Sequence, residues 1–233
     1  MTLRVARVED HPGAVAAWRA SQGGRGQRPS AARVARVEEK LAEPGALLIV
    51  AFDGPEIVGM ALGEPARTRD GAGDLEPGLV HLSMLFVVPT HWRQGIGSAL
   101  IEGLADAAWG QGYRNISVWT RVDNTPALSL YDACGLERTA RLQDLPDGTS
   151  AAQFVAELEA PVRSVVVRSE GIRLGQLLKL AELVDTGSEG KELLEAGGVQ
   201  VNGEVEIRRG RQMASGDVVH ARDQAIQVVL ADA

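Results

Sequence analysis

The segment from Leu79 to Leu136 places the strongest constraint on what this chain can fold into. It opens with an apolar run over 79–88, which predicts a buried strand that stops at Pro89. A helix is then predicted to end near Trp109, and the turn before this helix reads Arg93-Gln94-Gly95-Ile96-Gly97-Ser98. Such a turn is a natural anion cradle, because its N–H groups are free and glycine lets a phosphate approach the backbone.

The rest of this segment adds a second strand and a second helix. In the helix after the glycine turn, Ile96, Leu100 and Leu104 recur every four residues, so one face should pack on a sheet. A strand is predicted over 115–120. The stretch that begins at Asn124 reads Asn-Thr-Pro-Ala-Leu-Ser-Leu-Tyr-Asp-Ala-Cys-Gly-Leu. This ordered set is far more specific than a Gly-x-Gly sequence alone.

The set resembles the GNAT superfamily of acetyl-CoA-dependent N-acetyltransferases, over about residues 1–160. The family motif is V-x-P-x-x-(R/Q)-x-x-G-x-(G/A), then a strand, then N-x-x-A-x-x-(L/F)-Y-x-x-x-G-F. The matching residues here are Val87, Pro89, Gly95, Gly97, Asn124, Ala127, Leu130, Tyr131, Gly135 and Leu136. One position departs, since Trp92 stands where Arg or Gln is usual and Arg93 follows it. The resemblance implies an α+β or α/β fold, with a mixed, mostly antiparallel sheet flanked by helices.

The resemblance also implies a binding site for acetyl-CoA as cosubstrate. Backbone groups of Phe86, Val87 and Val88 would hold the pantetheine arm and the thioester carbonyl. Asn124 would hydrogen-bond the pantetheine arm. The diphosphate would lie on the N–H groups of Arg93, Gln94, Gly95, Ile96, Gly97 and Ser98. The Arg93 side chain would add a charge-assisted contact.

Acetyl transfer needs a neutral amine, a polarised carbonyl and a proton for the leaving thiolate. Tyr131 is the candidate acid, because a phenol with a pKa of about 10 can protonate a thiolate; the alternative is a core tyrosine. His81 and Ser83 alternate to one face of the first strand, and His81 has a suitable pKa for a base. A structural histidine is the alternative there. Cys134 is expected to be inert, because no histidine is paired with it.

Other elements of the first region are predicted from local patterns. Before the glycine turn we expect an edge strand over 2–8 and a helix from His11 to about Ala20. A flexible basic loop over 23–29 should follow, and then a helix capped by Ser30 and ending near Ala42. We then expect a hairpin of strands 47–52 and 57–62, and a mobile loop over 64–78. After it we expect strands over 136–142 and 153–159. By resemblance, the early helix pair and its neighbouring loops build the acceptor side.

A new pattern begins after Ala160-Pro161, which predicts two domains, 1–160 and 162–233. Helices are expected over 172–181 and 188–196, with a hairpin over 199–205 around an Asn-Gly turn and another turn into a strand over 215–219. Over about 165–230 this order resembles the S-four-type (αL) RNA-binding domain. Two positions depart from that family: Gly187 stands where many members carry Arg, and Gly190 where Ala is usual.

The resemblance implies that the helices and the hairpin loop of this second domain form one RNA-facing surface. The basic residues available for phosphate contacts are Arg173, Lys179, Lys191, Arg208, Arg209 and Arg211. The alternatives are a solvated face, and a module for protein docking or dimerisation. Residues 161–233 carry 9 Lys and Arg against 11 Asp and Glu, within a net charge of −7 for the whole chain. RNA contact must therefore come from a local patch.

Composition excludes several other classes of protein. A single cysteine rules out a disulfide framework and a cysteine-rich zinc site. No metal is expected, because the four histidines, His11, His81, His91 and His220, show no ligand spacing. The chain has no run of about 18 apolar residues and no hydrophobic signal core, so a cytoplasmic location without a membrane partner is expected.

The sequence therefore predicts a cytoplasmic two-domain N-acetyltransferase that uses acetyl-CoA. Its C-terminal domain would direct it to an acceptor amine associated with RNA or a ribonucleoprotein. The alternative is a non-catalytic RNA or ribosome adaptor that retains the acetyltransferase fold. The glycine turn and Tyr131 favour the enzyme.

Overall fold

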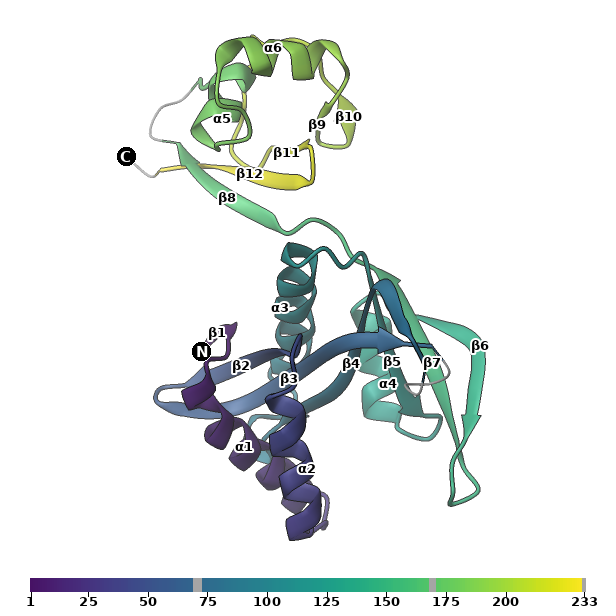
Figure 1. Ribbon diagram of the computed structural model, residues 1–233. Coiled ribbons are helices and arrows are strands. Elements are labelled where there is room, and N and C mark those ends of the chain that lie inside the picture. The colour runs from purple at the N-terminus through teal and green to yellow at the C-terminus, as the bar shows by residue number, and fades with distance from the viewer. Residues whose placement is uncertain (69–72, 168–170, 232–233) are drawn as a thin grey trace. The chain divides into compact units, whose positions relative to one another are not determined.

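The computed structural model describes residues 1–68, 73–167 and 171–231 (Figure 1). The chain divides into two compact units, Met1–Glu159 and Ala160–Ala233. Each unit contains its own sheet and its own hydrophobic core. Among the described residues, no helix combines the length and the apolarity needed to span a membrane.

The first unit is built on a seven-stranded sheet with the order β1-β2-β3-β4-β5-β7-β6. Its strands are β1 (Thr2–Val5), β2 (Leu47–Asp53), β3 (Glu56–Arg67), β4 (Leu75–Val87), β5 (Asn115–Arg121), β6 (Glu137–Asp144) and β7 (Ser150–Glu157). Neighbouring strands are antiparallel except for β4 and β5, which are parallel. This arrangement confirms the predicted mixed, mostly antiparallel sheet.

The parallel pair β4–β5 is short and then parts. Its register covers only Leu79–Leu82 against Asn115–Val118. Beyond Leu82, β4 continues to Val87 with β3 as its partner, whereas β5 continues to Arg121 beside β7. The last residues of β4 therefore have one backbone edge without a strand partner, and this edge leads directly to the glycine turn.

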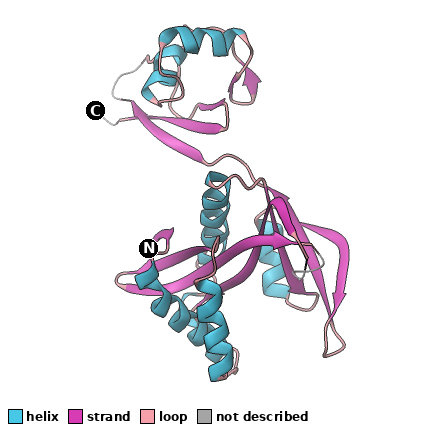
Figure 2. Ribbon diagram, in the orientation of Figure 1, coloured by secondary structure: helices cyan, strands magenta, loops and turns pink. Residues whose placement is uncertain are grey.

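Helices cover both faces of the sheet (Figure 2). They are α1 (His11–Gly24), α2 (Ala31–Leu41), α3 (Ile96–Gly110) and α4 (Thr125–Ala133). Alternate residues of β2 point to opposite faces. Ile49 packs in the core that contains Leu100 and Leu104 of α3, and Val50 packs in the core that contains Trp18 of α1. Because both faces are covered, β2 is buried almost throughout.

One loop prediction in the first unit is shifted by two residues, and another is wrong. The predicted loop over 23–29 begins later, because α1 continues to Gly24 and packs there against Pro89. A methyl group on Gly24 would lie 2.2 Å from Pro89 Cγ, so only glycine allows this approach. Most of the predicted loop over 64–78 is strand, with residues 69–72 outside the described part. The pairing of β3 with β4 is irregular next to Pro65, and this irregularity allows proline, which has no backbone N–H, to lie within the hairpin.

The second unit contains a five-stranded sheet with the order β10-β9-β11-β12-β8, packed with two helices. Its elements are β8 (Val162–Val167), α5 (Leu174–Leu180), α6 (Gly187–Glu195), β9 (Val199–Val201), β10 (Glu204–Val205), β11 (Val218–Ala221) and β12 (Gln224–Leu230). The predicted helices and hairpin are present. Asn202 and Gly203 both have positive φ, as a tight hairpin turn requires. The parallel pairing of β8 with β12 goes beyond the elements expected from the sequence.

Candidate active site

Within the glycine turn, a residue with left-handed backbone conformation precedes the first residue of α3. Gly95 is the N-cap residue, with a φ of 78°, and Arg93 also has a positive φ of 61°. No described side chain caps the first N–H groups of α3, so these donors remain available for an anion. Gly97 lies against α4, where a methyl group would approach Leu130 Cδ2 to 3.1 Å. The turn thus combines free donors with close backbone packing.

Trp92 joins this turn to the end of β4. Its indole Nε1–H donates to the carbonyl oxygen of Val87 at 2.7 Å. The N–H of Val88 donates to Val58 in β3, and strand alternation therefore directs the Phe86 backbone to β3 as well. Val87 instead presents its backbone groups to the edge where β4 has left β5. Of the three residues predicted to hold the pantetheine arm, only Val87 faces that edge, and Trp92 occupies its carbonyl.

Asn124 and Tyr131 lie at the start and near the end of α4. The Asn124 amide donates to Thr120 Oγ1 in β5 at 3.1 Å. Tyr131 is 6% exposed, and its ring centroid lies 5.8 Å from that of Phe154. Burial raises the pKa of Tyr131 to about 12, so its hydroxyl is protonated at neutral pH. Burial also raises the pKa of the Cys134 thiol, which leaves little thiolate.

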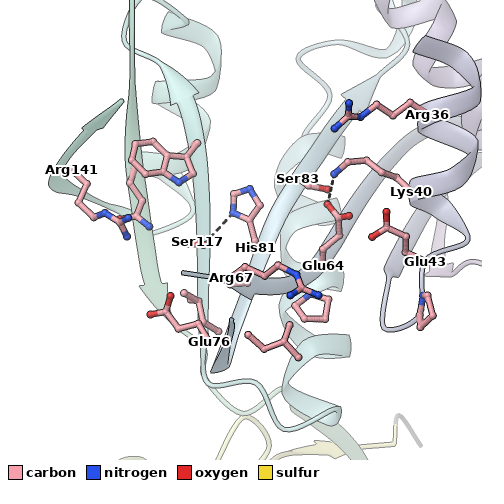
Figure 3. Close-up of a pocket in the computed structure, with 17 residues that line it drawn as sticks. Arg36, Lys40, Glu43, Glu64, Arg67, Glu76, His81, Ser83, Ser117 and Arg141 are labelled. Atoms are coloured by element: carbon pink, nitrogen blue, oxygen red, sulfur yellow. Dashed lines mark hydrogen bonds and ion pairs between the residues drawn. The ribbon is translucent and has the colours of Figure 1, made fainter. Parts of the chain in front are cut away.

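A cavity of about 750 Å³ lies over the sheet where β4 and β5 are still paired (Figure 3). His81 in β4 is the cross-strand partner of Glu64 in β3 and of Ser117 in β5. The three side chains therefore form a polar row across three strands. His81 Nδ1 lies 3.2 Å from Ser117 Oγ, and Ser83 lines the same cavity.

Lys40 of α2 completes this row at the Glu64 end. Its Nζ lies 2.6 Å from Glu64 Oε2, and both side chains are largely buried. Burial lowers the pKa of His81, the negative charge of Glu64 opposes this shift, and the positive charge of Lys40 adds to it. His81 is therefore neutral at pH 7. When Nδ1–H donates to Ser117, the free Nε2 can accept a proton.

The cavity wall carries both signs of charge. Its charged lining residues besides the Lys40–Glu64 pair are Arg36, Glu43, Arg67, Glu76 and Arg141. Sequence reasoning identified the region of the early helices but none of these residues, because α2 reaches the sheet only through tertiary packing. Within the described ranges, no group of three His, Cys, Asp or Glu side chains could hold a metal ion.

The six predicted RNA-binding residues of the second unit fall into different environments. Arg208 and Arg211 both pair with Glu206, and Lys191 pairs with Glu195 one helical turn away. Lys179 is exposed on α5. Arg173 and Arg209 line a separate cavity of about 380 Å³.

Comparison with known families agrees with this geometry. Residues 14–136 match the acetyltransferase (GNAT) family, and residues 165–229 match the S4 domain. The fold and site thus define an acetyltransferase with an appended S4 domain. The chain belongs to the GNAT acetyltransferase family, a family of N-acetyltransferases that use acetyl-CoA.

Two curated proteins resemble separate parts of the chain. Over 96 residues it is 33% identical to the mouse "Probable N-acetyltransferase family 8 member 5", a match that covers 41% of this chain and 40% of the relative. Over 55 residues it is 44% identical to the "Probable ribosome maturation protein RlbA" of Bacillus subtilis (strain 168). That match covers 24% of this chain and 78% of the relative. The chain thus spans less than half the length of the mouse relative.

Solved structures share the fold of the first unit. The ribosomal-protein-S18-alanine N-acetyltransferase of Escherichia coli aligns with a TM-score of 0.53 and 19% identity, over 69% of this chain and 95% of that one. The yncA structure from Salmonella typhimurium, solved with acetyl-CoA, aligns with a TM-score of 0.54 and 20% identity, over 70% and 96%. At these identities the likeness establishes the fold.

Proposed function

We propose that this chain transfers the acetyl group of acetyl-CoA to an amine held in the cavity beside His81. The observation that carries this proposal is the position of the cavity. His81 and Ser117 pair only one residue before β4 and β5 separate. An acceptor next to His81 would therefore meet a thioester that lies along the open edge of β4.

The residues around this edge fit acetyl-CoA, which would supply the activated acetyl group. The free N–H groups from Gly95 to Ser98 suit the diphosphate, because the left-handed Gly95 lets them converge. The N–H of Val87 faces the same edge and suits a carbonyl of the pantetheine arm, whereas the Val87 carbonyl is bonded to Trp92. The Asn124 side chain donates to Thr120, which leaves its oxygen as an acceptor toward the same region.

Two residues of the chain would move protons. Neutral His81 would accept a proton from the acceptor amine, and Ser117 would orient its ring. Tyr131 would donate its hydroxyl proton to the departing thiolate. The lowered pKa of His81 supports this assignment, because it favours the neutral ring that a base requires. Tyr131 carries its hydroxyl proton at neutral pH, as an acid must, and burial makes it a weaker donor than a free phenol.

We expect Gly97→Asp to weaken acetyl-CoA binding on the order of 100-fold, because it adds a negative charge to the first turn of α3 beside the proposed diphosphate, with its Cβ directed toward Leu130 of α4. Titration calorimetry measures the change. Gly110→Asp is the matched control, since it introduces the same side chain at the other end of α3, where a Cβ meets nothing within 4 Å. Equal acetyl-CoA affinity in the parent and the Gly97 variant would show that the diphosphate lies elsewhere.

The S4 domain would direct the enzyme to an acceptor associated with RNA or a ribonucleoprotein in the cytoplasm. Support comes from the S4 match and from the ribosome-linked names of one relative and one structural neighbour. Linkage of two binding units raises the effective concentration when both engage one target.

Radiolabelled acetyl-CoA offers a direct test of this function. We expect the full chain to label a component of intact ribosomal particles, and fragmented ribosomal RNA added in excess to suppress that labelling. Acetylation of a small free amine should be unchanged by the same RNA, because the competitor blocks recruitment and leaves the chemistry intact. A chain that binds the particles but acetylates neither substrate would instead be a non-catalytic adaptor.

A further inference from the structure

The Arg-Arg-Gly-Arg run at 208–211 divides into two kinds of arginine. Arg208 Nη2 lies 2.7 Å and Arg211 Nη1 3.1 Å from Glu206 Oε2. The Glu206 side chain is only 5% exposed, and the hydrogen bond from Arg208 holds the pKa of its carboxyl well below the usual range. A carboxylate buried this deeply needs its partners. Arg208 and Arg211 therefore stabilise the loop.

Arg209 is held in a different way. Its carbonyl oxygen accepts the N–H of Gly175 at 3.0 Å, which fixes the backbone of this residue against α5. Its side chain then crosses two glycines. A methyl group on Gly175 would lie 2.5 Å from Arg209 Cγ, and one on Gly187 would lie 3.0 Å from Nη2. Glycine at both positions lets the Arg209 side chain approach α5 and the start of α6 this closely.

The surroundings of this guanidinium are rich in donors. Arg209 forms no ion pair with any described residue. Arg173 and Gln176 line the same 380 Å³ cavity, and no described carboxylate does so. The Gln176 oxygen accepts the backbone N–H of Arg173 at 3.0 Å, which leaves the amide NH₂ as the free end of that side chain. The nearby acid in α6, Glu189, is paired with Arg222.

We propose that Arg209, together with Arg173 and the Gln176 amide, binds a phosphate group of an RNA backbone in this cavity. Two like charges that line one cavity with no described carboxylate beside them favour an anion between them, and guanidinium donors match phosphate oxygens in pairs. The polar side chains that line the cavity, those of Arg173, Gln176 and Arg209, offer the N–H donors that a ligand made of acceptors requires. This inference rests on the proposed association of the S4 domain with RNA.

The first experiment compares arginines within the run. Binding of fragmented ribosomal RNA to the full chain is measured at several salt concentrations for the parent, Arg209→Gln and Arg208→Gln. Loss of one phosphate contact should weaken binding about tenfold at low salt and reduce the slope of log K against log salt by about 1. We expect this change for Arg209→Gln. Arg208→Gln should keep the parental salt slope but unfold at a lower temperature, because it removes a partner of the buried Glu206.

The second experiment moves Arg209 without removing its charge. In Gly187→Ala the methyl group would lie 3.0 Å from Nη2, the flexible end of the Arg209 side chain, so the fold is retained and the guanidinium must give way by a few tenths of an ångström. Gly190→Ala is the matched control in the same helix, because its methyl group would make an ordinary 3.4 Å contact with Val184. We expect Gly187→Ala to weaken RNA binding, Gly190→Ala to leave it unchanged, and the double variant Gly187→Ala/Arg209→Gln to bind like Arg209→Gln alone.

The outcomes separate this inference from the function on which it rests. If the parent binds the RNA and Arg209→Gln matches it in affinity and salt slope, the phosphate site is wrong while RNA association stands. If the losses of RNA affinity from Gly187→Ala and Arg209→Gln add in the double variant, the proposed position of the Arg209 side chain is also wrong. If the parent binds no RNA at low salt, the RNA association itself is wrong, and the phosphate site falls with it.

Discussion

Tyr131→Phe is expected to lower kcat by about 10²–10⁴-fold, the range typical of general acid catalysis, with little change in acetyl-CoA affinity. Burial holds the Tyr131 hydroxyl in its protonated form, with a pKa of about 12, so it can supply a proton when the thiolate leaves. The substitution removes one oxygen and keeps the ring contact with Phe154. Single-turnover rates with a small amine and calorimetry with acetyl-CoA measure the two quantities.

The chain contains a matched control for this change. Tyr113 is the other tyrosine, and it belongs to the same unit as Tyr131 but lies outside α4. Tyr113→Phe removes the same oxygen and should leave kcat at the parental value. An undiminished single-turnover rate in Tyr131→Phe would remove the acid role and leave Tyr131 as a core residue.

The parts of the fold that the sequence predicted are those with local causes. The strand that ends at Pro89, the helix after Gly95 and the Asn-Gly hairpin depend on residues close together in the chain. Backbone preference and hydrophobic spacing are enough to place such elements. The cap of α2 is of the same kind, since Ser30 Oγ accepts the N–H of Arg33.

What the sequence did not predict depends on long-range packing. The hairpin that replaces the expected loop over 64–78 is held by pairing of β3 with β4, which overrides a composition rich in glycine and proline. The Lys40–Glu64 pair joins a helix to a strand 24 positions away. The difference between Arg208 and Arg209 depends on a buried glutamate and two glycines from other elements, which no count of basic residues reveals.

His81→Gln should lower kcat/KM for a small amine by about 10²–10⁴-fold, because the proposed base is lost. It should also change the pH profile. A general base works in its neutral form, so kcat/KM rises with pH through the pKa of His81 in the free enzyme. Burial lowers that pKa, so the midpoint of the acid limb should lie below about 6.5. The glutamine variant should have no such limb.

The neighbours of His81 give the sharpest form of this test, because they shift its pKa in opposite directions. Lys40→Met removes a positive charge that lowers the pKa, so the acid limb should move to higher pH. Glu64→Gln removes a negative charge that raises the pKa, so the limb should move to lower pH. Lys179→Met, the same change in the other unit, should leave the profile unchanged. General damage to the fold cannot produce shifts of opposite sign, so two shifts in one direction, or none, would mean that another group titrates.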